Sequence, residues 1–306
     1  MMKKENDEIV VSKKPRSLSD KVFDFSVYAI LAVVLVIILY PLYFVVIASF
    51  SDPLAVMAGD VHFWPVNFNT ESYRLVFKNS QVLTGYRNTI AYTVAGTFVN
   101  VLMSIAAAYP MAQRNLKGKG IGLAMMVFTM FFQGGMIPTY INLNTLGFLN
   151  TFWVMIIPNA ISVYNVMIMR TFFATSIPYE LQEAAFVDGA SHMRILRSIV
   201  LPLSKPILAV MVLFYAVSHW NSYFNALLYL SDQERYPLQL VLRAILIQSQ
   251  ASEESFAGIG NTYSRMLLSE TMKYALIIVS SVPVLILYPF LQKYFVHGVM
   301  IGSVKG

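Results

Sequence analysis

The chain has 306 residues, of which 57% are apolar and only 12% are charged. That composition excludes an ordinary soluble domain and predicts an all-α integral membrane protein. The formal net charge of +6 comes mainly from lysines and arginines beside the apolar runs, so it indicates membrane topology rather than a nucleic-acid partner.

Long uncharged runs divide the chain, and roughly 20 residues suffice for a helix that spans the hydrocarbon of a bilayer. The third run is long enough for two such helices, and Gly134-Gly135 and Pro138 interrupt its middle. We therefore predict six transmembrane helices in a domain of residues 23–306, after an N-terminal tail of residues 1–22. The uncharged runs are residues 25–50, 89–112, 121–169, 206–231 and 274–292.

The first run follows basic residues, as in a signal peptide, but it is 26 residues long and contains Pro41. Its length favours a retained helix over a cleaved signal. Of the 22 lysines and arginines, 15 lie in the segments on one side of the six predicted spans. Cytoplasmic segments carry the excess of these residues, so both termini are predicted to be cytoplasmic. Residues 51–88 and 231–272 are then expected as outer loops.

A polar segment, residues 178–202, separates the fourth and fifth predicted spans. Pro178 suits a first helical position because the N–H that it lacks has no partner there. The helix is expected to end at Asp188-Gly189, since glycine adopts the left-handed conformation without a steric penalty. Ser191 then caps a second short helix that ends at Pro202. The segment is thus predicted to be two helices at an angle on the cytoplasmic side.

The first of these helices has a small and acidic surface. Ala184, Ala185 and Ala190 let another protein approach closely, and Glu183 and Asp188 add negative charge. A helix that merely lies on the membrane surface usually carries lysine and arginine on its polar face. The acidic character therefore favours a docking surface over an interfacial helix.

The fifth predicted span is rich in aromatic and neutral polar residues. Amides and hydroxyls hydrogen-bond sugar hydroxyls, and aromatic rings cover the apolar faces of pyranose rings. The same residue types also hold transmembrane helices together, so packing remains the alternative for each of them. Further candidates are Gln133, Asn159, Tyr164 and Asn165 in the third and fourth spans. The candidate path residues of the fifth span are Tyr215, His219, Trp220, Asn221, Tyr223 and Asn225.

Several kinds of site are missing from the sequence. There is no cysteine, and the four histidines show no metal-ligand spacing, so no metal site is expected. The chain has no GxxxxGK[ST] loop to hold ATP phosphates, so an energy source must lie in another protein. No acidic or basic residue occurs in the middle of a predicted span, which argues against a proton- or sodium-coupled carrier.

The segment EAAFVDGASHMRILRSIVLPLSKP, residues 183–206, resembles the cytoplasmic coupling motif of ABC importer permeases. The resemblance covers roughly residues 20–306, and Leu196 stands where that family more often has an aromatic residue. Within that family, the chain resembles permeases of carbohydrate importers related to the maltose permease, in the lipoprotein- or polysaccharide-transport branch. The runs that carry this resemblance are GGMIPTYINLNTLGFLNT, VYNVMIMRTFF, HWNSYFNALLYL, YPLQLVLR and the ending FVHGVMIGSVKG.

The resemblance implies a type I ABC importer permease fold in the bacterial plasma (inner) membrane. It further implies a non-enzymatic chain that pairs with a second homologous permease, two ATPase subunits that bind ATP and magnesium, and an extracellular sugar-binding lipoprotein. The cargo would be an oligosaccharide. The residues expected to couple to the ATPase are Glu183, Ala184, Ala185, Asp188, Gly189 and Ala190.

The sequence is also compatible with two other functions. The coupling motif is compatible with an importer of another solute, such as a polyamine, phosphate or a peptide. A secondary carrier, or a structural membrane protein without an ATPase, is a further alternative.

Overall fold

The computed structural model describes residues 18–254, 272–287 and 289, and the regular elements in these ranges are helices. The first elements in chain order are α1 (Leu18–Ser49), α2 (Pro53–Ala58), α3 (Glu71–Lys78), α4 (Ser80–Ala112), α5 (Lys119–Phe131) and α6 (Met136–Thr145). Next come η1 (Phe152–Met155), η2 (Ile157–Asn159), α7 (Val163–Thr175), α8 (Tyr179–Val187), α9 (His192–Ile195), η3 (Leu196–Val200) and α10 (Leu201–Leu203). The last elements are α11 (Lys205–Trp220), α12 (Phe224–Tyr229), η4 (Gln233–Arg235), α13 (Leu238–Glu254) and an apolar helix Met272–Leu287.

Two of these helices, α1 and α4, are each long and apolar enough to cross a membrane. Three bent helix pairs are further candidate spans: α5 with α6 at 110°, η1–η2 with α7 at 53°, and the α9–α10 run with α11 at 83°. Length and composition thus give up to five spans among the described residues. The sixth predicted span stays a prediction, because only Met272–Leu287 and residue 289 of its run are described.

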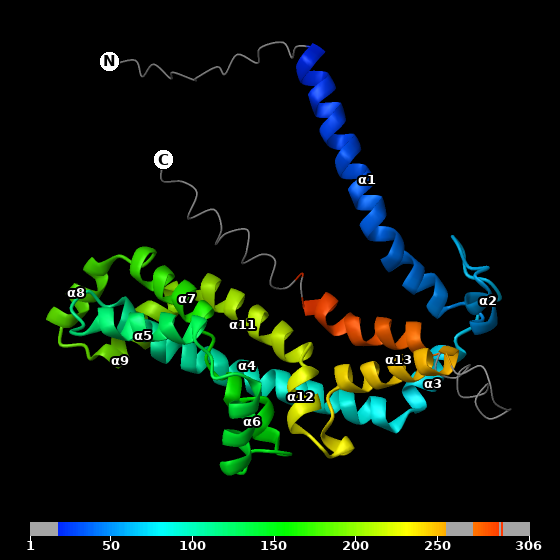
Figure 1. Ribbon diagram of the computed structural model, residues 1–306. Coiled ribbons are helices and arrows are strands. Elements are labelled where there is room, and N and C mark those ends of the chain that lie inside the picture. The colour runs from blue at the N-terminus through cyan, green and yellow to red at the C-terminus, as the bar shows by residue number, and fades with distance from the viewer. Residues whose placement is uncertain (1–17, 255–271, 288, 290–306) are drawn as a thin grey trace.

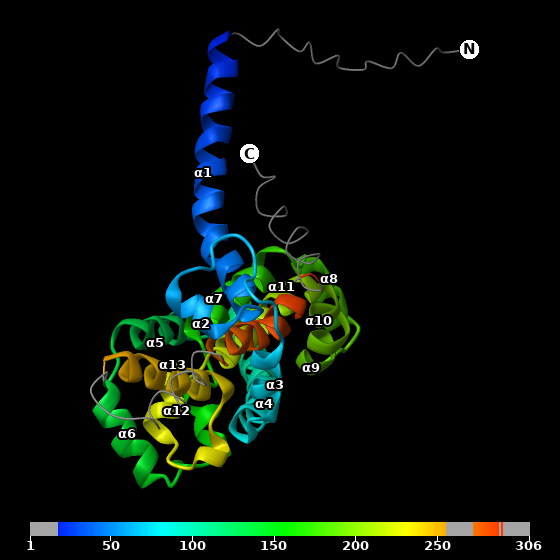
Figure 2. The ribbon, with the colours of Figure 1, turned by 90° about the vertical axis from the view of Figure 1, so that its right-hand side faces the viewer.

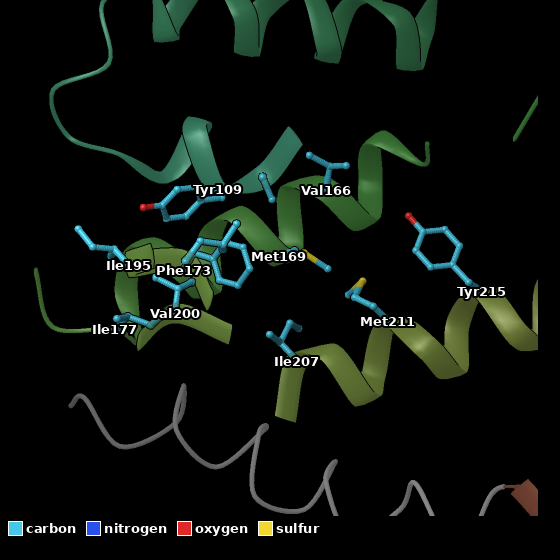
Figure 3. Packing of buried hydrophobic residues seen from close by; sticks show 12 residues of the cluster. Tyr109, Val166, Met169, Phe173, Ile177, Ile195, Val200, Ile207, Met211 and Tyr215 are labelled. Carbon is cyan, nitrogen blue, oxygen red and sulfur yellow. The ribbon is translucent and has the colours of Figure 1, made fainter. Parts of the chain in front are cut away.

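Helix α4 lies at the centre of the bundle and packs mainly against α11, α7 and α13. Two glycines permit this close packing. A methyl carbon at Gly85 would lie 3.1 Å from the Cα of Leu238, and one at Gly96 would overlap the imidazole of His219. Figure 3 shows the largest buried cluster, in which α4, α7 and α11 meet the α9–α10 run.

Helix α1 extends away from this bundle, as Figures 1 and 2 show from two sides. Only its last residues, Ile47, Ala48 and Ser49, are buried. The hydroxyls of Tyr40 and Tyr43 donate to the backbone oxygens of His62 and Phe63, which ties the C-terminal half of α1 to the following loop. Such an exposed apolar helix is suited to contact with lipid.

Three sequence-based expectations need correction. Residues 231–272 are not simply an outer loop, because α13 lies within them and packs on α4. The run 206–231 is not one helix, because α11 ends at Trp220 and α12 follows after a break. The expected outer loop of residues 51–88 contains α2, α3 and the start of α4. Most of the tail 1–22 and the whole ending 295–306 lie outside the described residues.

Candidate functional site

The first half of the polar segment folds as its local chemistry predicts. Helix α8 ends at Val187 with Asp188 as its C-cap, and Gly189 has a φ of +77°, the left-handed conformation that favours glycine. The N–H of Ala190 donates to the oxygen of Ala185 at 2.9 Å and closes the turn. Pro178 occupies the capping position instead of the first helical one, since its ψ of 127° is extended.

The second half is longer and less regular than expected. The hydroxyl of Ser191 accepts a hydrogen bond from the N–H of Arg194 at 3.4 Å and caps α9. A π-helix, η3, follows, and the N–H of Leu201 bonds to the oxygen of Leu196. The helical run does not stop at Pro202 but continues to Leu203, because this wide turn accommodates a residue that has no N–H to donate.

The predicted coupling residues border two hollows on the surface of this segment. Glu183 lines an apolar groove of about 1000 Å³ between the end of α4 and the α8–α9 pair. Ala185, Asp188 and Ala190 border a smaller hollow of about 220 Å³ that also contains Arg194. Glu183, Ala184, Asp188 and Gly189 are exposed, whereas Ala185 and Ala190 are half-buried against the core.

A second site is a polar cavity of about 460 Å³ among α4, α5, α7, α11 and α12. Its wall also contains apolar side chains, such as Met155 and Phe214, but no aspartate, glutamate, lysine or arginine of the described chain. Neutral donors and acceptors of this kind suit a hydroxyl-rich ligand. The polar residues of the wall are Asn100, Thr129, Gln133, Asn159, Ser162, Asn165, Tyr215, Ser218, His219, Ser222 and Asn225.

Hydrogen bonds between α4 and α11 fix one side of this cavity. The Nδ2 of Asn100 donates to the backbone oxygen of Asn159 at 2.5 Å. The Oδ1 of Asn100 therefore accepts from the Nε2 of His219, at 2.6 Å. One turn along both helices, the hydroxyls of Ser104 and Tyr215 lie 2.6 Å apart. These two bonds lock the facing surfaces of α4 and α11 in one register.

Comparison with protein families decides the identity of this architecture. Residues 82–301 match the family model described as the binding-protein-dependent transport system inner membrane component. This chain belongs to that family. It is therefore an all-helical permease of a binding-protein-dependent ABC importer in the inner membrane, and a transport component instead of an enzyme.

Individual relatives agree with this assignment. Protein LplC of Bacillus subtilis is 39% identical over 287 residues, which cover 94% of the permease and 96% of that protein. The polygalacturonan/rhamnogalacturonan transport system permease protein YtcP of the same organism is 37% identical over 289 residues, covering 94% and 100% of the two chains. A crystal structure of a bacterial ABC transporter involved in the import of the acidic polysaccharide alginate superposes with a TM-score of 0.84 at 33% identity, over 92% of the permease and 99% of that chain.

The structure distributes the candidate path residues of the permease over different environments. Tyr215, His219 and Asn225 line the polar cavity. Trp220 lies outside its wall and is only 5% exposed, with its indole N–H donating to the oxygen of Ser280 at 2.9 Å. Asn221 and Tyr223 are exposed and also lie outside the wall.

Sequence reasoning did not single out Asn100, although this residue makes two hydrogen bonds at the cavity. A usable signal is the spacing of Gly96, Asn100 and Ser104, which places a small residue and two polar ones on a single face of the helix. Of the further candidates, Gln133, Asn159 and Asn165 line the cavity, and Tyr164 does not.

We expect Gly189→Val to lower solute uptake several-fold without loss of the permease from the membrane. There is space for a side chain at this position, since a Cβ atom added to Gly189 would meet no described atom within 4 Å. The penalty for valine is the backbone conformation, about 1–2 kcal/mol for a residue with a Cβ at positive φ. Uptake per amount of membrane-inserted permease measures the effect.

Gly189→Asn is the matched control, because asparagine tolerates the left-handed region. It should retain most of the uptake. Equal loss in both variants would contradict an explanation based on backbone conformation.

Proposed function

We propose that this permease forms half of the passage of an ATP-driven importer for oligosaccharides. The observation that carries the proposal is the cavity of about 460 Å³ whose polar wall is made of amides, hydroxyls and one imidazole. Hydroxyl-rich cargo exchanges hydrogen bonds with such groups and needs no ion pair. YtcP transports polygalacturonan and rhamnogalacturonan, and the solved transporter imports alginate; both are over 30% identical to this permease and support a carbohydrate cargo.

In this proposal the permease has six spans with both termini in the cytoplasm. A second, homologous but different permease supplies the other half of the passage, and a sugar-binding lipoprotein delivers the cargo from outside. Two ATPase subunits bind ATP and magnesium on the cytoplasmic side. Closure of the ATPase pair moves the coupling segments together, and the permeases turn from inward- to outward-facing as rigid bodies.

The coupling residues in this proposal are those that surround the exposed surface of α8 and its glycine turn. Exposed acidic and small residues give the ATPase a close and charged contact. Glu183 contributes the charge nearest the apolar groove, and Gly189 sets the angle between α8 and α9. The full set is Glu183, Ala184, Ala185, Asp188, Gly189 and Ala190.

In the passage, we assign sugar contact to the residues of the cavity wall, including Tyr215, His219 and Asn225. We assign a packing role to Trp220, because its ring meets Tyr86 edge-on at 5.8 Å and its N–H is already bonded. Asn221 donates to the backbone oxygen of Val217 at 2.9 Å and helps to end α11.

The test compares Asn225→Ala with Trp220→Ala. Loss of one hydrogen bond to the sugar should lower uptake per assembled transporter by about 2- to 10-fold in Asn225→Ala, with normal assembly. Trp220→Ala should instead reduce the amount of assembled transporter, because removal of a buried tryptophan destabilises a fold by about 3–5 kcal/mol.

Uptake of labelled oligogalacturonides and maltodextrins, with spermidine as a non-sugar comparison, measures both the rate and the cargo class. Uptake of spermidine alone would refute the carbohydrate assignment. An Asn225→Ala variant with native uptake of every sugar would remove this residue from the passage.

A further inference from the structure

The cytoplasmic end of α4 contacts the coupling segment through an aromatic group. Tyr109 is only 7% exposed, and its hydroxyl donates to the backbone oxygen of His192 at 3.3 Å. The ring of His192 lies edge-on to Phe186, with ring centres 4.8 Å apart, and 6.5 Å from the ring of Tyr109. His192 therefore sits between α4 and α8 and touches both helices.

Two more contacts extend this connection along α8. The Nε2 of Gln113, at the end of α4, donates to the Oε1 of Gln182 at 3.2 Å, and Gln182 is 5% exposed. The guanidinium of Arg114 lies 4.5 Å from the ring centre of Tyr179. Residues 179, 182 and 186 share one face of an α-helix. Helix α8 thus turns one face to the end of α4, and Val187, which is 88% exposed, lies at the border of the groove between them.

Helix α4 continues without a break from this contact to the cavity. Asn100 lies nine residues before Tyr109, a distance of about 14 Å along the helix axis. Two covalent routes also join the coupling segment to the cavity. One runs through Ser204, where the chain bends by 83° before α11, and the other runs through residues 176–178, which form the non-helical connection between α7 and α8. A continuous helix transmits a displacement more directly than a bent connection does.

We propose that His192 and Tyr109 form the joint through which α8 moves α4 when the ATPase subunits close. The joint consists of Tyr109, Gln113, Gln182, Phe186 and His192. Movement of α4 then shifts Asn100 and Ser104, and with them the side of the cavity that is bonded to α11. His192 and Tyr109 are positioning residues, and their role rests on the coupling function proposed above.

The absence of cysteine from the sequence permits a direct test. Ser222→Cys places one thiol in the cavity wall, and its rate of modification by a maleimide reports how open the cavity is. In the purified transporter with all partner subunits, we expect addition of ATP and magnesium to change this rate at least about fivefold, the lower end of ordinary coupling between two sites.

In the His192→Ala background, the change caused by ATP should fall below about twofold while ATP hydrolysis continues. His192→Phe keeps a ring against Phe186 and should retain most of the change. Tyr109→Phe loses only the bond to the oxygen of His192 and should give an intermediate result. Because every rate is measured on assembled transporter, a merely structural role for His192 would leave the response to ATP intact.

If ATP changes the modification rate in His192→Ala as much as in the transporter with native His192, the proposed joint is refuted. The proposed function is tested separately by the Ser222→Cys transporter with native His192. If ATP leaves its modification rate unchanged, the cavity is not part of the moving passage, and the joint falls with it. If ATP changes the modification rate both with native His192 and in His192→Ala, the proposed passage is supported and only the joint is refuted.

Discussion

Glu183→Lys should abolish oligosaccharide uptake while the permease still inserts and folds. Glu183 is exposed at the edge of the groove between α4 and α8, so its charge is available to a partner protein. Reversal of a charge at a contact between subunits brings like charges together and costs several kcal/mol. Uptake by cells, and the amount of ATPase subunit that co-purifies with the permease, measure the two effects.

Glu180→Lys is the matched control for this variant. It makes the same change of charge on the same helix, one turn earlier and outside the groove. We expect it to retain most of the uptake. Native uptake by Glu183→Lys at normal abundance would refute the coupling role of this residue.

Gly96→Ala should sharply reduce the amount of folded permease. The added methyl group overlaps the imidazole of His219, which is held by the 2.6 Å bond to Asn100. Overpacking of a close contact destabilises a protein by about 1–3 kcal/mol, and displacement of His219 leaves buried polar groups of Asn100 and His219 without partners. Size-exclusion chromatography and thermal unfolding of the purified permease measure the loss.

Gly120→Ala makes the same substitution in α5, where a methyl group meets no described atom within 4 Å. This control should be neutral or slightly stabilising, because alanine favours a helix over glycine by about 1 kcal/mol. If Gly96→Ala is as stable as this control, the close approach of α4 to α11 does not limit the fold.

The polar segment was the part of the fold that the sequence predicted best, and its determinants are local. The turn at Gly189 and the cap at Ser191 depend on hydrogen bonds between residues no more than five positions apart along the chain. Such interactions are fixed by neighbouring residue types, so a short sequence window contains the information. The π-helix after α9 has no comparable signal, whereas the helical run ends at Leu203, one residue beyond the expected end at Pro202.

The cavity was predictable only in part, because its geometry depends on contacts between distant residues. Asn100 and His219 are separated by 119 positions. The spacing of Gly96, Asn100 and Ser104 indicates one face of a helix, but it does not identify His219 as the partner of Asn100. Absence of charge also fails to show where a helix ends. The uncharged run 206–231 gave no sign of the break after Trp220. It also did not show that Trp220 bonds to Ser280 while Tyr215 and His219 line the cavity.

The π-helix at Leu196–Val200 restricts how coupling segments can be exchanged between permeases. Insertion or deletion of one residue in a helix rotates everything beyond it by about 100°. Such a change between Ser191 and Ile195 would turn Leu196 and Val200 out of the buried cluster that they form with Tyr109 and Phe173. Recombination between related permease genes should therefore succeed only when the donor segment preserves the residue count of this interval, whatever its sequence similarity.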